Sequence, residues 1–328
     1  MLNFDRERLE AVWDRLVPLL PWFSLASGIV SALLLERSPE KAWMVAAAAG
    51  GVWISTGAAL YVTGRSAQSG RLQGVLHFSS LLALQSLIQL ALFFAGPFYI
   101  RAATWDVGHL AFLLLFAAAV VASTWDPIFY WVQNNRIFSS LLLSFATFAG
   151  LNCVLPMLGL SNWWSLITAS LLACIGIPLL GRLRSPIITE AKHRLALDVG
   201  IALALPLMLA FGAGRLVPPA PMRLSEAAMG TKLANKWVAD PQEELQNPSQ
   251  LVCATAIAAP RGLSDKLFHV WSKDGDKVDE IALKVRGGRE EGFRTWSIKK
   301  NFQAGTWRCQ VITDHGQLLG GVSVEVSN

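Results

Sequence analysis

The sequence predicts a membrane all-α part with about seven transmembrane helices, followed by a small all-β antiparallel sandwich domain. Three observations lead to this fold class. Of the 328 residues, 53% are hydrophobic and only 16% are charged, whereas soluble globular domains are usually about a quarter charged. Long apolar stretches fill the first part of the chain. From residue 250 onward, short strand-like segments alternate with glycine-containing turns.

The apolar stretches predict the membrane part. A helix that crosses a bilayer needs about 20 consecutive apolar residues, and its backbone must satisfy its own hydrogen bonds in lipid. Seven stretches meet this length or come close: Leu16–Leu35, Ala42–Val62, Val75–Ala95, Val107–Thr124, Ile137–Leu155, Trp163–Gly181 and Leu195–Ala213. We therefore assign residues 1–215 to a polytopic transmembrane helical domain, whose expected partner is the lipid bilayer.

The distribution of Lys and Arg predicts the orientation. Ten of these residues flank the spans on the side of the N-terminus and five lie on the opposite side, and cytoplasmic loops carry the excess of positive charge. With seven spans, the N-terminus is expected in the cytoplasm and the C-terminal domain on the periplasmic side of a bacterial inner membrane. Helix-flanking loops also explain the net charge of +5, so no nucleic-acid partner is predicted.

The composition changes after Ala213. Val217-Pro218-Pro219-Ala220-Pro221 predicts a stiff spacer, because proline cannot continue a helix. The segment Ser225–Leu245 is polar and is expected to be partly helical. We therefore assign residues 216–249 to a spacer and linker, and residues 250–328 to a β-sandwich-like extracytoplasmic domain. A fragment from about Thr231 to Asn328 is expected to fold alone.

Six short segments of the C-terminal part have the β-branched and aromatic composition of strands. They are Leu251–Ile257, Leu267–Trp271, Val278–Arg286, Phe293–Ile298, Trp307–Thr313 and Leu318–Val326. Asp274-Gly275 and His315-Gly316 are typical of hairpin turns. Six strands in so short a segment predict a small antiparallel sandwich.

Aromatic residues and turn glycines recur in order along these strands: His269-Val270-Trp271, Phe293-Arg294-Thr295-Trp296-Ser297, Gly305-Thr306-Trp307 and Gly316-Gln317. In this spacing, the segment from about Leu251 to Val326 resembles a bacterial domain of unknown function, the one numbered 2914. The whole layout is similar to a family of multi-helix proteobacterial membrane proteins of unknown function that carry this domain at the end. The resemblance implies a fold and a location, but no activity.

Strand alternation predicts which side chains share a face. His269 and Trp271 lie on one face of their strand, and Arg294 and Trp296 share a face of a later strand. Together with Trp307 they form a candidate recognition patch. The alternative is structural: some of these aromatic residues belong to the core, and Arg294 stacks on Trp271 or Trp307 as a cation–π brace.

Polar residues inside the spans are candidates for function, because lipid disfavours them. Gln85 and Gln89 share a face of the third span, Asn152 lies near the end of the fifth, and Asp198 lies one turn inside the seventh. They could line a transport path. Interhelical hydrogen bonds and, for Asp198, an interfacial pair with Arg194 explain them without one.

Cys253 and Cys309 form a candidate disulfide, because both lie on strand faces expected to point inward and disulfides persist outside the cytoplasm. The alternative is two free buried thiols. The five His residues are scattered singly, and the chain has no phosphate-binding loop and no nucleophile elbow. The sequence therefore predicts no catalytic residue, no cofactor and no metal.

Together, these features favour a non-enzymatic inner-membrane envelope protein. Its periplasmic β domain is expected to bind a partner, which would be a periplasmic protein, peptidoglycan or a glycan. The alternative is a transporter or an intramembrane enzyme with the β domain as an accessory. The spans lack a dense group of polar residues, which favours the first hypothesis.

Overall fold

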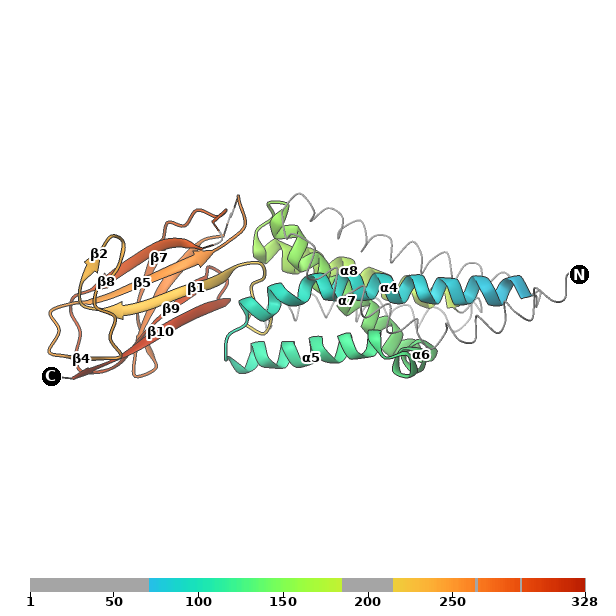
Figure 1. Ribbon diagram of the computed structural model, residues 1–328, viewed down its shortest axis with the longest axis horizontal. Coiled ribbons are helices and arrows are strands. Elements are labelled where there is room, and N and C mark those ends of the chain that lie inside the picture. The colour runs from blue at the N-terminus through green and yellow to red at the C-terminus, as the bar shows by residue number, and fades with distance from the viewer. Residues whose placement is uncertain (1–70, 185–214, 263–264, 290, 328) are drawn as a thin grey trace, which may run out of the picture. The chain divides into compact units, whose positions relative to one another are not determined.

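The computed structural model describes residues 71–184, 215–262, 265–289 and 291–327. Within them it has five helices and ten strands (Figure 1). The chain divides into two compact units. Of the described residues, one unit holds 71–97, 115–151 and 171–184. The other unit holds 98–114, 152–170 and the whole β-rich part from residue 215 onward.

The helices are α4 (Arg71–Ala102), α5 (Val107–Thr124), α6 (Asp126–Asn134), α7 (Arg136–Met157) and α8 (Asn162–Arg184). Four of them coincide with stretches that the sequence predicts as spans. The short helix α6 is not predicted. It has a proline in its first turn, where the missing N–H costs nothing, and it buries Phe129 and Val132.

The prediction of about seven transmembrane helices is wrong. Among the described residues, only α5 and the part Ile137–Met157 of α7 are long and apolar enough to cross a membrane, judged by length and composition. α4 and α8 are helical but do not meet this standard, and α4 carries polar residues such as Gln85 and Gln89 in its middle. The predicted spans Leu16–Leu35, Ala42–Val62 and Leu195–Ala213 lie outside the described residues.

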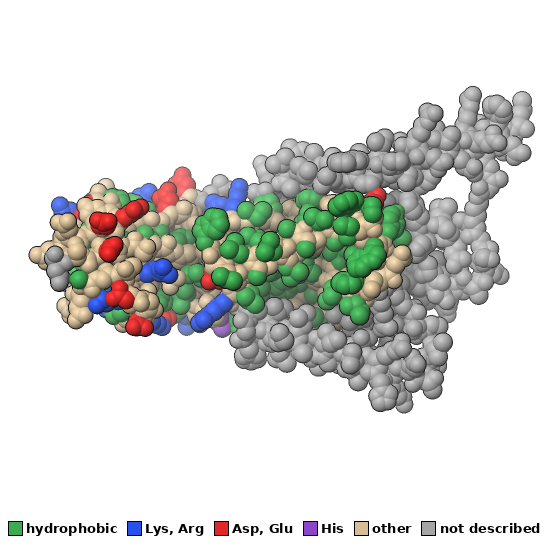
Figure 2. Space-filling view, turned by 90° about the horizontal axis from the view of Figure 1, so that it is seen from below, with side chains coloured by type: hydrophobic (Ala, Val, Ile, Leu, Met, Phe, Trp, Pro, Cys, Tyr) green, Lys and Arg blue, Asp and Glu red, His purple; other side chains and the backbone are tan. Residues whose placement is uncertain are grey.

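The helix α5 exposes much of its apolar surface. Only 33% of it is buried, against 72% of the candidate span in α7. Val107, Leu114 and Leu115 are exposed along it, and the exposed Trp105 and Trp125 lie just before and just after it. Figure 2 shows hydrophobic side chains over most of this helical face. An exposed face without charged residues is typical of a helix that contacts lipid.

The β-rich part consists of two main sheets and one small hairpin. The first sheet is antiparallel and has the order β1 (Arg223–Gly230), β5 (Leu251–Ala258), β8 (Phe293–Lys299). The second has the order β4 (Glu244–Gln246), β10 (Leu318–Ser327), β9 (Gly305–Thr313), β6 (Leu267–Lys273), β7 (Asp276–Leu283). Its pairs are antiparallel except the short parallel pair β4–β10. β2 (Leu233–Ala234) and β3 (Trp237–Val238) form the hairpin.

The core lies between the two sheets, as the predicted sandwich requires. Alternate residues of β5, such as Leu251 and Cys253, pack against Trp271 of β6 and Trp307 of β9. The other face of β5 is also buried, because Val252 and Ala254 pack under the β2–β3 hairpin through Val238. This second cover explains why all eight residues of β5 are buried.

The strand pattern from residue 250 onward is confirmed. Each of the six predicted strands is present, with its bounds shifted by a few residues at most. The turn between β6 and β7 is Asp274-Gly275, whose φ angles are 53° and 97°. Two successive positive φ angles are typical of the type I′ turn, which follows the twist of the strands it joins.

The prediction of a partly helical linker before residue 250 is wrong. Residues 223–246 hold β1, the β2–β3 hairpin and β4, so they are part of the sandwich. Ala and Met in β1 favour a helix in isolation, but β1 pairs with β5 from Arg223 to Gly230 and this pairing decides its structure. The proline-rich segment is also packed: Val217, Ala220 and Met222 are buried.

Candidate functional site

The predicted recognition patch does not form one exposed surface. His269 and Trp271 are completely buried, and Trp307 is 2% exposed. Trp271 and Trp307 contact each other edge to face, with ring centroids 6.4 Å apart. Their strands are central in the five-stranded sheet, so the face that these residues share points toward the other sheet and becomes core.

A buried polar network surrounds His269. Its two ring nitrogens hydrogen-bond with the hydroxyl groups of Thr255, at 2.9 Å, and Ser297, at 2.7 Å. The indole N–H of Trp271 donates to the same Ser297 oxygen at 3.0 Å. Burial lowers the pKa of His269 to about 4, so the imidazole is neutral at pH 7. Each polar atom of this network has a partner, which is the usual condition for polar groups inside a core.

The pKa of His269 predicts a loss of stability in acid. Between pH 6.5 and pH 4 the unfolded chain takes up a proton that the folded core excludes, so stability is complete above pH 6.5 and falls as the pH is lowered. The full difference corresponds to about 3 kcal/mol in the free energy of unfolding. Urea titrations at several pH values measure it.

The control for this prediction is His269→Gln, which keeps a neutral hydrogen-bonding side chain and should lose this part of the pH dependence. The imidazole signal of His269 in the native protein, followed by NMR, gives the pKa directly. A midpoint near 6.5 would contradict the prediction.

Arg294 and Trp296, the other two residues of the patch, lie on the outer face of β8. Both are exposed, with Trp296 at 38%. The Arg294 guanidinium lies over the ring of Trp237, 5.3 Å from its centroid. A cation–π brace therefore exists, but Arg294 stacks on Trp237 of the β2–β3 hairpin and not on Trp271 or Trp307.

A disulfide joins Cys253 of β5 to Cys309 of β9, with Cα atoms 6.5 Å apart. It links the two sheets through the core. The ligand atoms of Cys253, His269 and Cys309 all lie within 4.8 Å of one another, the proximity that a metal site would need. The two sulfur atoms are bonded to each other and both ring nitrogens of His269 have hydroxyl partners, so this group has no free ligand atom as it stands.

The polar residues of the helices make hydrogen bonds within their own units. The Gln85 side-chain amide donates to the backbone oxygen of Ser123 and to Asp126, both at 3.0 Å. Gln89 donates to the same Ser123 oxygen at 2.7 Å. These contacts are the interhelical bonds of the structural alternative.

Asn152 makes a similar bond and donates to the Tyr99 hydroxyl at 3.1 Å. Asp198 lies outside the described residues. Gln85, Gln89 and Asn152 therefore all make contacts that hold helices together.

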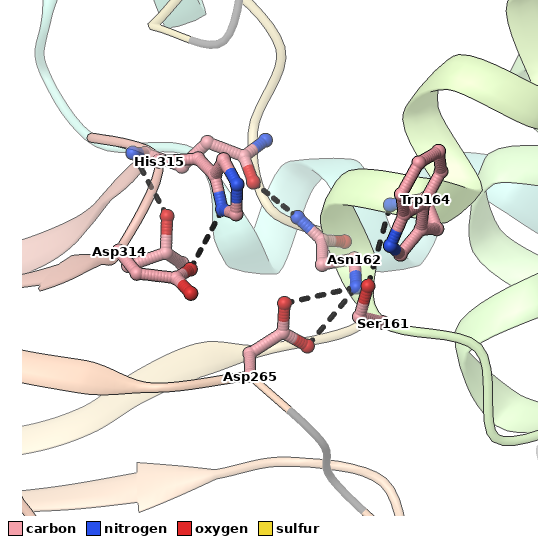
Figure 3. Close-up of polar contacts among 8 residues, drawn as sticks. Ser161, Asn162, Trp164, Asp265, Asp314 and His315 are labelled. Atoms are coloured by element: carbon pink, nitrogen blue, oxygen red, sulfur yellow. Dashed lines mark hydrogen bonds and ion pairs between the residues drawn. The ribbon is translucent and has the colours of Figure 1, made fainter.

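The N-terminus of α8 makes a polar connection to loops of the β part, within the same compact unit (Figure 3). Both carboxylate oxygens of Asp265 accept from the backbone N–H of Asn162, at 3.0 Å each. The Asn162 side chain donates to Gln317, and Trp163 stacks on His315 with ring centroids 4.3 Å apart.

Asp265 thus caps α8 from a distant part of the chain, and its negative charge suits a helix N-terminus. Burial raises the pKa of Asp265 above its usual value, although the N–H donors of the helix oppose this shift. The contacts of Asp265 and Asn162 serve to join the helix to the β part.

A groove of about 720 Å³ opens between β1 and β10. We call it the β1–β10 groove, and its lining residues are Ala227, Ala228, Met229, Pro241, Gln242, Glu243, Glu244, Thr306, Val322, Ser323, Val324 and Glu325. β1 is the edge of its sheet, and β10 pairs with β4 only from Glu325 onward. Two strand edges therefore border the same opening.

The segment Pro241–Glu244 crosses one end of the groove. Gln242 N–H donates to the Met229 oxygen of β1 at 3.1 Å, and Glu325 N–H of β10 donates to the Glu243 oxygen at 2.8 Å. Asp240 holds the start of this segment, because its carboxylate accepts from the backbone N–H of Lys232 at 2.8 Å and of Thr231 at 3.2 Å. Glu243 and Glu244 are thereby fixed beside Glu325.

Asp240 itself is ionised at neutral pH. Slight desolvation raises its pKa, but hydrogen bonds from the Thr231 side chain and from the Lys232 and Thr231 backbone prevail and lower it.

The lining of the β1–β10 groove carries three carboxylates and contains no Lys, Arg or His. The sequence does not predict this groove, because β1 and β4 lie in the segment interpreted as a linker and no local motif marks them as strands.

Two family models match the chain. The one described as a family of unknown function, DUF5924, matches residues 2–255, and the one described as a protein of unknown function, DUF2914, matches residues 264–326. The second match confirms the resemblance of the C-terminal part. No curated protein and no solved structure matches the chain.

The two matches divide the sandwich. The first ends inside β5 and the second begins before β6, so the three-stranded sheet takes β1 and the first part of β5 from one match and β8 from the other. The Cys253–Cys309 disulfide also joins the two matched segments. The first family model matches residues 2–255, which is most of the chain, so the chain belongs to the family of unknown function DUF5924.

Proposed function

We propose that this chain is a non-enzymatic membrane protein that displays its β-sandwich for partner recognition on the periplasmic side of a bacterial inner membrane. The observation that carries the proposal is the combination of the exposed apolar helix α5 with a disulfide in the core of the sandwich. Disulfides persist in oxidising compartments such as the periplasm and are rare in the cytosol. The partner is a periplasmic protein, peptidoglycan or a glycan.

The dimensions of α5 support its place in the bilayer. Its 18 residues give a length of about 27 Å, close to the ~30 Å hydrocarbon core of a bilayer. Trp105 and Trp125, which flank it, are 93% and 59% exposed. Tryptophan is enriched where a helix leaves the hydrocarbon for the headgroups. In water, such a surface would favour aggregation.

A substitution at the middle of α5 tests the membrane location. Leu114 is 73% exposed, so Leu114→Arg would be harmless in water but costs about 2.5–3.5 kcal/mol at the centre of a bilayer. We expect Leu114→Arg to lower the amount of protein in carbonate-washed membranes severalfold. The matched control Trp105→Arg lies at the helix end, where arginine reaches the headgroups, and should leave the amount nearly unchanged.

Reciprocal fusions at the C-terminus test the side of the membrane. Alkaline phosphatase, which needs an oxidising compartment, should be active there, and a fluorescent protein that matures only in the cytoplasm should be dark. The opposite pair of results, or equal loss of membrane protein with Leu114→Arg and Trp105→Arg, would contradict the proposal.

A further inference from the structure

We propose that the β1–β10 groove binds a short, extended, positively charged peptide segment of a partner protein. This inference rests on the proposed function and names the ligand class that the sandwich recognises. Three features of the groove carry it: two open strand edges, small side chains along its walls, and a lining whose charged groups are all carboxylates.

The strand edges supply the means of recognition. The outer edge of a strand presents N–H and C=O groups that pair readily with another extended chain, and peptide binding by strand addition uses such edges. Within the part of the chain that the structure describes, no strand pairs with the outer edge of β1, nor with that of β10 before Glu325. Ala227, Ala228 and Ser323 are small, so a ligand backbone can come close to these edges.

The ends of the groove limit the length of the ligand. At one end, β1 and β10 meet where Leu224 packs on Gly320: a Cβ at Gly320 would lie 2.7 Å from the Leu224 Cδ2 atom. At the other end, Pro241–Glu244 crosses from β1 to β10. The wall of β10 between these ends consists of Val322–Glu325, a rise of about 13 Å at ~3.3 Å per residue. The groove therefore accommodates three or four residues of a chain terminus or loop tip.

The charge of the lining selects among such segments. Glu243, Glu244 and Glu325 are the only charged residues of the lining. A lysine- or arginine-bearing segment is electrostatically complementary to them, whereas an acidic segment is repelled. Complementary charge also accelerates encounter and makes binding depend on salt. A neutral glycan would use neither the charge nor the extended backbone edges.

Synthetic peptides test the ligand class on the full chain in nanodiscs of neutral phosphatidylcholine. The probe is a fluorescent, acetylated tetrapeptide of alternating lysine and valine, and binding is measured by fluorescence anisotropy. One comparison peptide has glutamate in place of lysine, and another is N-methylated at alternate amides, which removes backbone donors. We expect the first peptide to bind at least about tenfold more tightly than either comparison peptide, and more weakly as salt is raised.

Variants test the location. The triple variant Glu243→Gln, Glu244→Gln, Glu325→Gln is expected to weaken binding of the lysine peptide about tenfold. Its matched control, Asp276→Asn, Glu280→Gln, Glu291→Gln, changes the charge equally at exposed positions outside the groove lining and should alter binding less than about twofold. Ser323→Trp fills the groove without a change in charge and should abolish binding.

Equal binding of the lysine, glutamate and N-methylated peptides would overturn the inference, as would equal effects of the two triple variants or no binding of any peptide. None of these results changes the side of the membrane on which the β-sandwich lies, which the fusions determine independently. A failed inference is therefore distinguishable from a failed proposed function.

Discussion

A fragment that begins at residue 231, which the sequence predicts to fold alone, is expected from the structure to remain unfolded, whereas a fragment that begins at residue 217 is expected to fold. Only the longer fragment contains residues 217–230, which include β1, and β1 pairs with β5 along its whole length. It also contains Met222 and Met229, both about 1% exposed and both in the core. Truncating one buried methionine costs about 2–5 kcal/mol, and a whole domain is stable by only about 5–15 kcal/mol.

Circular dichroism and hydrogen exchange of β5 measure this result in the two fragments. Two substitutions on β1 provide a matched control in the longer one. Met229→Ser removes a core side chain and should destabilise by several kcal/mol, while Glu226→Ser alters an exposed side chain and should stay within about 0.5 kcal/mol. A cooperatively folded fragment from residue 231 would show that β1 is dispensable.

Removal of the disulfide is expected to lower the free energy of unfolding of the sandwich by about 4 kcal/mol, from the loop-closure entropy of cysteines 56 positions apart. The double variant Cys253→Ala, Cys309→Ala removes the covalent link through the core and leaves the two sheets joined by packing and by the hydrogen bonds of His269 and Trp271. The loss should appear as faster hydrogen exchange in both β5 and β9, because opening of the sandwich exposes both strands at once.

Reduction provides the control for this prediction. Dithiothreitol should bring the native protein to the exchange rates of the double variant and should leave the variant unchanged. The double variant Cys153→Ala, Cys174→Ala removes the two free cysteines of the helices that the structure describes and should not alter exchange in β5 or β9. Two alkylated thiols at Cys253 and Cys309 in protein taken from membranes without reductant would contradict the prediction.

Local patterns were sufficient for the second half of the sandwich. The positions of the strands from Leu251 to Ser327 follow from alternating β-branched and aromatic residues, and Asp274-Gly275 marks a turn that only residues tolerant of positive φ adopt easily. Helix positions were equally visible, since four of the five described helices coincide with apolar stretches. These features depend on interactions between residues that are close in the chain.

Other features depend on which distant segments meet. The apolar stretches of α4 and α8 look like that of α5 in the sequence, although among the described helices only α5 and part of α7 are long and apolar enough to cross a membrane. Strand alternation placed His269 and Trp271 on a shared face but could not say that this face meets the other sheet. Arg294 stacks on Trp237, which lies in the segment that the sequence predicts as a linker, so strand alternation alone did not identify this partner.

The sequence by itself determined that apolar helices precede a β-rich part, where most strands of that part begin and end, and which residues of a strand lie together. Tertiary structure alone decided that residues 223–246 complete the sandwich, which face of each strand is buried, and that Glu243 and Glu244 lie beside Glu325. The physical reason is the separation along the chain of the residues that interact. Propensity and alternation act between neighbours in the chain, whereas β1 becomes a strand because β5, more than 20 residues away, offers it an edge to pair with.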